Sequence, residues 1–153
     1  MGSLFRPRFL ASSLAAVTLA THAYGQESEL QQAIQRHLAK QGPVMEAPRT
    51  VMADLDGNGT AEAVVSYCIN GSASAEKNNP VKVRCSVSIF IQKNGRWVGA
   101  GQAKLDQGKV RDVRGGVIYA DSVTFGPNDP PCCPSRTILR RFALKNGKLT
   151  QLR

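Results

Sequence analysis

The sequence predicts an α+β fold that is mainly β, an antiparallel meander sheet with one N-terminal helix packed on it. Three observations predict this fold class. One segment near the N-terminus has apolar residues at helical spacing, several later segments alternate with the period of a strand, and the turn pairs Asn94-Gly95 and Asn146-Gly147 separate such segments. Successive short strands joined by tight turns are typical of an antiparallel meander.

The expected helix covers about residues 28–40. Ser28 and Gln31, three residues later, form a capping-box pair, and Gly42-Pro43 ends the pattern. The apolar face consists of Leu30, Ala33, Ile34, His37 and Leu38. Because His37 shares this face, we expect a histidine at the edge of the core rather than a metal ligand.

The expected strands follow Pro48, where the period of the pattern changes to two. They cover residues 51–53, 62–69, 81–91, a return strand that begins at Trp97, and 108–113, 117–124, 136–144 and 148–152. The segment 62–69 is apolar on both faces, which is typical of a strand covered on both sides. The polar stretch 70–80 is expected to be an exposed loop.

The first 25 residues are expected to be a signal peptide. Arg6 and Arg8 precede an apolar run over residues 9–20, and Ala23-Tyr24-Gly25 offers the small residues of a cleavage site. We expect cleavage after Gly25, with a cut after Ala23 as the alternative. The run is shorter than the ~20 apolar residues that span a bilayer, although an uncleaved short anchor is a second interpretation. Residues 26–153 would then form a single β-rich domain in the periplasm or outside the cell.

The charge of this domain is strongly positive. Removal of Arg6 and Arg8 leaves 18 Lys and Arg against 11 Asp and Glu, a net charge of about +7. Such a surface favours an unknown acidic protein or an anionic envelope component as partner, although the charge could serve solubility alone. Nucleic acid is not expected as a partner of an exported protein with few aromatic residues. We expect a monomer that does not span the membrane after cleavage.

An acidic segment between the first two expected strands has the spacing of a calcium loop. The residues at loop positions 1, 3, 5, 7 and 9 are Asp54, Asp56, Asn58, Thr60 and Glu62. Gly59 at position 6 allows a sharp turn, and calcium requires six to eight oxygen ligands. An EF-hand would need a Glu where Val65 stands, so the spacing resembles instead the calcium loops of FG-GAP repeats. We expect a structural calcium ion; the alternative is a β-turn without metal.

All four cysteines lie in the expected mature domain, where an even number indicates disulfides. Cys68 and Cys85 lie in adjacent expected strands with 16 residues between them, and their bridge would stabilise the domain by ~3 kcal/mol. The alternation nevertheless places the two on different faces, so this pairing requires a bulge.

The remaining two cysteines lie in a proline-rich loop over residues 125–135. The loop residues with side chains suited to binding are Asn128, Asp129, Cys132, Cys133 and Ser135. Neighbouring cysteines can close an eight-membered ring, which makes a stiff and reducible turn. The loop is therefore a redox switch, a metal-binding thiol pair or a rigid recognition loop, or the bridge only stiffens it.

Four segments together resemble a group of small exported bacterial proteins that includes the LppP/LprE-type lipoproteins. These segments are residues 54–65, 111–116, 126–135 and 147–149, and the Cys-Cys-Pro-Ser sequence is the most specific of them. The resemblance implies an envelope location and no established catalytic activity. Members often lack counterparts of Cys68 and Cys85, which implies that Cys132 and Cys133 bond to each other. No lipid-modified cysteine is expected here.

The sequence does not predict an enzyme. Ser135 lacks the Gly-x-Ser-x-Gly context of a nucleophile, and Asp121 is expected to be a partly buried carboxylate paired with an Arg or with backbone. The leading hypothesis is an exported envelope binding module with a structural calcium loop and an unknown ligand. The alternatives are an inhibitor or immunity protein against a cell-wall hydrolase, and a thiol-redox protein that uses the neighbouring cysteines.

Overall fold

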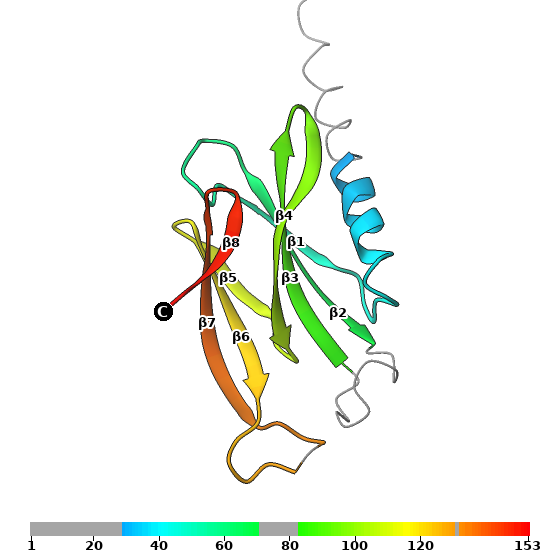
Figure 1. The fold of residues 1–153 in the computed structure, drawn as a ribbon, viewed down its shortest axis with the longest axis vertical. Coiled ribbons are helices and arrows are strands. Elements are labelled where there is room, and N and C mark those ends of the chain that lie inside the picture. The colour runs from blue at the N-terminus through cyan, green and yellow to red at the C-terminus, as the bar shows by residue number, and fades with distance from the viewer. Residues whose placement is uncertain (1–28, 71–82, 131) are drawn as a thin grey trace, which may run out of the picture.

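The structure of the chain is a computed structural model that describes residues 29–70, 83–130 and 132–153 (Figure 1). The expected signal peptide and nearly all of the expected exposed loop lie outside the described residues. Residues 29–38 are helical. Eight strands follow: β1 (Arg49–Ala53), β2 (Glu62–Asn70), β3 (Val83–Lys93), β4 (Arg96–Asp106), β5 (Val110–Arg114), β6 (Val117–Thr124), β7 (Arg136–Lys145) and β8 (Lys148–Leu152). Among the described residues, no helix has the length and apolar character needed to cross a membrane.

The α+β fold, mainly β, is confirmed, but the sheet is not a simple meander. Its order is β1-β2-β3-β4-β6-β7-β8, and β5 pairs with β6 alone. Neighbouring strands are antiparallel except β4 and β6, which meet in parallel through Asp106 and Val123. The chain turns sharply after β4, where Asp106 has a φ of 56° and Gly108 N–H donates to the Leu105 carbonyl. This turn directs β5 away from β4 and leaves β6 as the neighbour of β4.

The sheet has two hydrophobic cores, one on each face. The first lies inside the curved sheet and contains Val64, Val87 and Ile89 together with residues of β4 to β7. The second lies between the helix and the outer face of β2, β3 and β4, where Ile34 contacts a cluster that includes Val65. The segment expected to be covered on both sides is thus buried on both faces, as its apolar pattern predicts.

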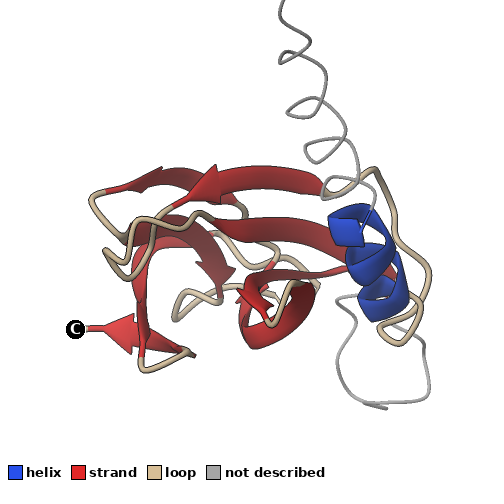
Figure 2. Cartoon of the chain, turned by 90° about the horizontal axis from the view of Figure 1, so that it is seen from above, coloured by secondary structure: helices blue, strands red, loops and turns tan. Residues whose placement is uncertain are grey.

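The sheet curves until its last strand approaches its fourth (Figure 2). At the contact, a Cβ added to Gly101 of β4 would lie 2.9 Å from the Leu149 Cβ and 3.0 Å from the Leu149 backbone nitrogen. Glycine is therefore required here by close approach of two strands. Gly99, two residues earlier on the same strand, has open space at the corresponding position.

We predict that Gly101→Ala lowers the free energy of unfolding by about 1–3 kcal/mol, because the added methyl group forces β8 away from β4. The matched variant Gly99→Ala meets no neighbouring atom and leaves stability unchanged or slightly raised. Urea unfolding of both variants measures the difference. Equal stability of the two variants would contradict the proposed contact between these strands.

Candidate functional site

The acidic loop connects β1 to β2 and is closed at its base by their pairing. The antiparallel register places Ala53 opposite Glu62, so both ends of the loop are fixed by the sheet. One carboxylate oxygen each from Asp54, Asp56 and Glu62 lie within 4.8 Å of one another. The structure therefore brings together the three predicted acidic residues in a cluster that could hold a metal ion.

Glu62 is the fixed member of this cluster. Its side chain is buried with a residue exposure of 3 %, and its Oε2 accepts the Leu55 backbone N–H at 2.7 Å. Leu55 in turn is buried in the first core, so the loop is held to the body of the protein between its acidic residues. Asp54 and Asp56 are exposed. The cluster is thus open to solvent on one side and rigid on the other.

The exposed half of the loop is organised by backbone N–H groups that donate to its own side chains. The Asp54 carboxylate accepts hydrogen bonds from Gly57 at 2.8 Å, Asn58 at 3.2 Å and Gly59 at 2.9 Å. Gly59 has a φ of +84°, a conformation that other residues rarely adopt. These contacts hold the Asp54 carboxylate over the turn.

The predicted ligands at positions 5 and 7 complete the turn. The Asp56 carboxylate accepts the Asn58 N–H at 3.1 Å, and the Asn58 amide oxygen accepts the Thr60 N–H at 2.7 Å. A carboxylate or amide oxygen has two lone pairs, so these hydrogen bonds leave each oxygen able to contact a cation. The loop therefore offers a set of oxygen donors, which is the set that hard cations such as Ca²⁺ and Mg²⁺ prefer.

The electrostatics of the cluster favour a positive charge. Burial raises the pKa of Glu62; the hydrogen bond from Leu55 opposes this, and the charges of Asp56 and Asp54 add to it. Three carboxylates at this separation repel one another, and a divalent cation would remove the repulsion. The donor set and the charge thus fit a metal ion, whereas the geometry alone does not identify calcium.

Cys68 and Cys85 form a disulfide across β2 and β3. They are directly opposite in the register, with their Cα atoms 4.0 Å apart. The expected mismatch of faces was wrong, because Val64 of β2 lies in the same core as Val87 of β3, and Cys68 packs against that core. The pairing needs no bulge between these strands.

Cys132 and Cys133 bond to each other in the loop between β6 and β7, which extends from one end of the sheet (Figure 1). Both residues are exposed, as are Asn128 and Ser135. Two cysteine pairs are compatible with a protein of the periplasm or the extracellular space.

Asp129, also predicted as a contact residue of this loop, is engaged within it. Its carboxylate accepts the Gly126 N–H at 2.6 Å, the Ser135 N–H at 2.7 Å and the Ser135 hydroxyl at 2.7 Å. These hydrogen bonds, with that from Gly126 the largest contribution, lower the pKa of Asp129. The side chain therefore connects the two ends of the loop and holds its shape.

A polar cluster under the helix was not found by sequence reasoning. His37 Nε2 lies 3.1 Å from the Tyr67 hydroxyl and 3.0 Å from Ser88 Oγ, and Gln102 donates to Tyr67 at 3.0 Å. Ser88 is almost completely buried, so it is not accessible as a nucleophile. Helical spacing predicts His37 at the edge of the core. Its hydrogen-bond partners could not be predicted in the same way, because they lie 30 or more residues away along the chain.

Asp121 was expected to be partly buried and paired with an Arg or with backbone, and its partner in the structure is an Arg. Arg111 of β5 makes an ion pair with it, with Nη2 2.9 Å from Oδ1, and Nε donates to Oδ2 at 3.2 Å. The Asp121 side chain is 15 % exposed. The carboxylate is thus a structural link between β5 and β6.

We predict that stability falls as the pH is lowered through the titration of His37. Burial, and secondarily the charge of Lys40, lower the pKa of His37 below its usual 6.5 in the folded protein. The unfolded chain therefore binds a proton first, so the free energy of unfolding decreases below about pH 6.5. Urea unfolding at pH 7.5, 6.5 and 5.5 measures this slope. His37→Gln should remove the slope over this range, and an unchanged slope in that variant would contradict the assignment.

We predict that Asp129→Asn loosens the loop without unfolding the domain. The neutral amide makes weaker hydrogen bonds to Gly126 and Ser135, so hydrogen exchange at these two amides becomes faster. The same change should occur in the unaltered protein when the pH falls below 3.8 and through the lowered pKa of Asp129. Asn128→Ser, an exposed change in the same loop, is the control. Identical exchange in both variants would show that Asp129 does not connect the ends of the loop.

None of the protein-family models matches this chain, and neither a curated protein nor a solved structure is significantly similar to it.

Proposed function

We propose that this chain is an exported, non-enzymatic binding module of the cell envelope whose acidic loop binds calcium as a structural ion. The observation that carries the proposal is the cluster of three carboxylate oxygens within 4.8 Å on a loop whose base is fixed by the sheet. An organised loop of this kind loses little entropy when it binds an ion.

Calcium is favoured over other cations by the donors. All of them are oxygens, which argues against zinc and copper, and two of the three acidic side chains are exposed on a turn. Mg²⁺ requires a more regular octahedral arrangement and usually keeps several water molecules. Asp54, Asp56 and Glu62 would hold the ion, with the Asn58 amide and the Thr60 carbonyl as further ligands. Bound there, the ion would supply positive charge that stabilises the hairpin of β1 and β2.

A binding role is supported by the partners of the titratable side chains. His37 is hydrogen bonded beneath the helix, Asp121 is paired with Arg111, and Asp129 is used within its own loop. Each of these groups has a structural function that accounts for its position. The exposed Cys-Cys loop, held in shape by Asp129, provides a preorganised contact surface.

An inhibitor of a cell-wall hydrolase is a second candidate, and the same loop favours it. The loop extends from the end of the sheet (Figure 1), and both of its cysteines are exposed. A rigid projecting loop suits insertion into the cleft of another protein. Binding to a secreted hydrolase that weakens on mild reduction of the protein would support this candidate.

We predict a saturable calcium binding isotherm by calorimetry of the oxidised protein after chelation, with a Kd of ~10⁻⁴ to 10⁻³ M. At a calcium concentration one hundred times the Kd, the free energy of unfolding should rise by about 2.7 kcal/mol. Asp54→Asn/Asp56→Asn should abolish both effects. Glu29→Gln/Glu46→Gln removes two exposed carboxylates outside the loop and should leave both effects unchanged. If calorimetry detects no heat of binding at millimolar calcium, the loop is a turn that binds no metal.

A further inference from the structure

A polar groove lies on the outer face of the sheet where the helix stops. The helix covers the part of β2, β3 and β4 that carries Val65 and Phe90, and it is followed by a turn over residues 39–41. Beyond this turn the outer face is open and forms a groove of about 310 Å³. We define the polar groove by Gln41, Arg84, Ser86, Gln102, Lys104 and Phe125.

The groove has two basic side chains. Lys104 of β4 is directly opposite Ser86 in the register, and Arg84 lies two residues before Ser86 on the same face of β3. Within the described part of the chain, neither Arg84 nor Lys104 makes an ion pair. Two cations on one face without a compensating carboxylate create a local positive potential that favours an anion.

One acidic residue also lines the groove, but its charge is already compensated. The Asp106 carboxylate lies 3.4 Å from Arg140 Nη2 of β7 and accepts the Ser122 hydroxyl at 3.1 Å. Both partners belong to the β6 and β7 side of the sheet. The Asp106 carboxylate therefore interacts with groups other than Arg84 and Lys104.

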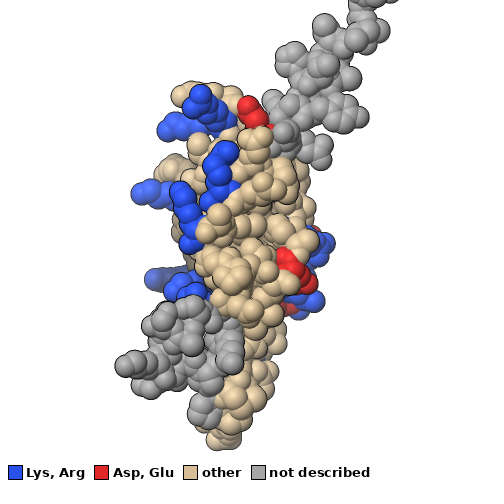
Figure 3. All heavy atoms as spheres, turned by 90° about the vertical axis from the view of Figure 1, so that its right-hand side faces the viewer, with Lys and Arg blue, Asp and Glu red and all other residues tan. Residues whose placement is uncertain are grey.

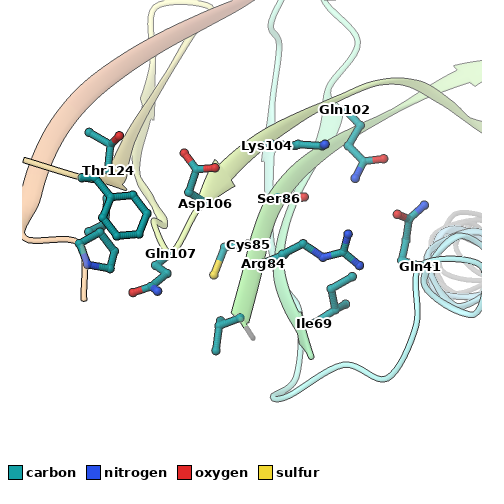
Figure 4. Close-up of a pocket in the computed structure, with 14 residues that line it drawn as sticks. Gln41, Ile69, Arg84, Cys85, Ser86, Gln102, Lys104, Asp106, Gln107 and Thr124 are labelled. Carbon is teal, nitrogen blue, oxygen red and sulfur yellow. The ribbon is translucent and has the colours of Figure 1, made fainter. Parts of the chain in front are cut away.

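Neutral polar and apolar groups complete the groove. Figure 4 shows the guanidinium of Arg84 turned toward Gln41, with Gln102 on the same side and Thr124 across the groove. Phe125 lines the groove at the base of the Cys-Cys loop and is 44 % exposed, so its ring is accessible to a ligand. The groove thus offers cations, amides and an aromatic surface within one concave site.

We infer that the polar groove binds the free C-terminal carboxylate of a short peptide. The Arg84 guanidinium can hold a carboxylate with two parallel hydrogen bonds, and Lys104 adds charge beside it. The side-chain amides of Gln41 and Gln102 can donate hydrogen bonds to peptide groups and accept them. Phe125 offers contact to an apolar side chain of the peptide. A volume of 310 Å³ is at the small end of the ~300–1,000 Å³ range of ligand sites, which fits one or two residues. This inference rests on the proposal that the domain is a binding module, and it names the ligand class.

The basic surface as a whole is a poorer candidate for the same ligand. Figure 3 shows Lys and Arg side chains spread over the side of the molecule that carries the helix, with acidic groups between them. A scattered charge attracts anions weakly and without selection. Two other cavities among the described residues also have two basic side chains each, but each of them includes a glutamate, Glu29 or Glu46, that makes no ion pair. In the polar groove the one carboxylate, Asp106, is already paired with Arg140.

The test is a titration of the oxidised, isotopically labelled protein with acetyl-alanyl-phenylalanine, followed by shifts of backbone amide resonances. We expect saturable shifts confined to the amides of Arg84, Ser86, Gln102 and Lys104. The same peptide with an amidated C-terminus should bind at least about ten-fold more weakly, because the charge-assisted hydrogen bonds are lost. Equal binding of the acid and the amide, or tighter binding of inorganic phosphate, would overturn the inference.

The double variant Arg84→Gln/Lys104→Gln should bind the peptide with a free C-terminus about as weakly as the unaltered protein binds the amidated peptide. The control Lys93→Gln/Arg96→Gln removes the same two kinds of charge at the opposite end of the same hairpin, beyond the polar groove. Equal loss in both variants would mean that net charge alone binds the peptide. Calcium titration of each variant keeps the two proposals separate, since the acidic loop is intact in both. Calcium binding without peptide binding would overturn the groove inference alone, and the converse would overturn the calcium site alone.

Discussion

The burial of both faces of β2 is the constraint on which the rest of the structure depends. Ala63, Val64 and Val65 are three consecutive residues with 1 % exposure or less. Alternate side chains of a strand point to opposite faces, so burial of all three requires a layer on each side of the sheet. The helix supplies one layer, and the curvature that brings β8 toward β4 encloses the other. Without both layers, one face of β2 would be exposed to water.

The strand β2 also sets the positions of the candidate functional groups. Glu62 begins β2 and is the buried carboxylate of the acidic loop, whereas Cys68 lies near the end of the strand, joined to Cys85. Tyr67 presents its hydroxyl to His37 of the helix between these two points. One strand therefore carries residues of the acidic loop, of the Cys68–Cys85 disulfide and of the polar cluster under the helix.

The Cys-Cys loop and the polar groove are structurally connected. Phe125 and Pro134 stand near the two ends of the loop, and both line the groove. Asp129 draws these ends together through its hydrogen bonds to Gly126 and Ser135. The two ends of the loop therefore form part of the wall of the groove.

Local sequence specifies the fold class, the approximate bounds of the helix and strands, the oxygen spacing of the acidic loop and the partial burial of Asp121. These features depend on local periodicity and turn residues, which neighbouring positions specify. The tertiary structure alone decided the parallel contact of β4 with β6, the face of Cys68, the hydrogen bonds of His37 and the polar groove. Each of these depends on which distant segments meet: the groove exists because the helix ends before it covers Ser86, and no local pattern records that distance.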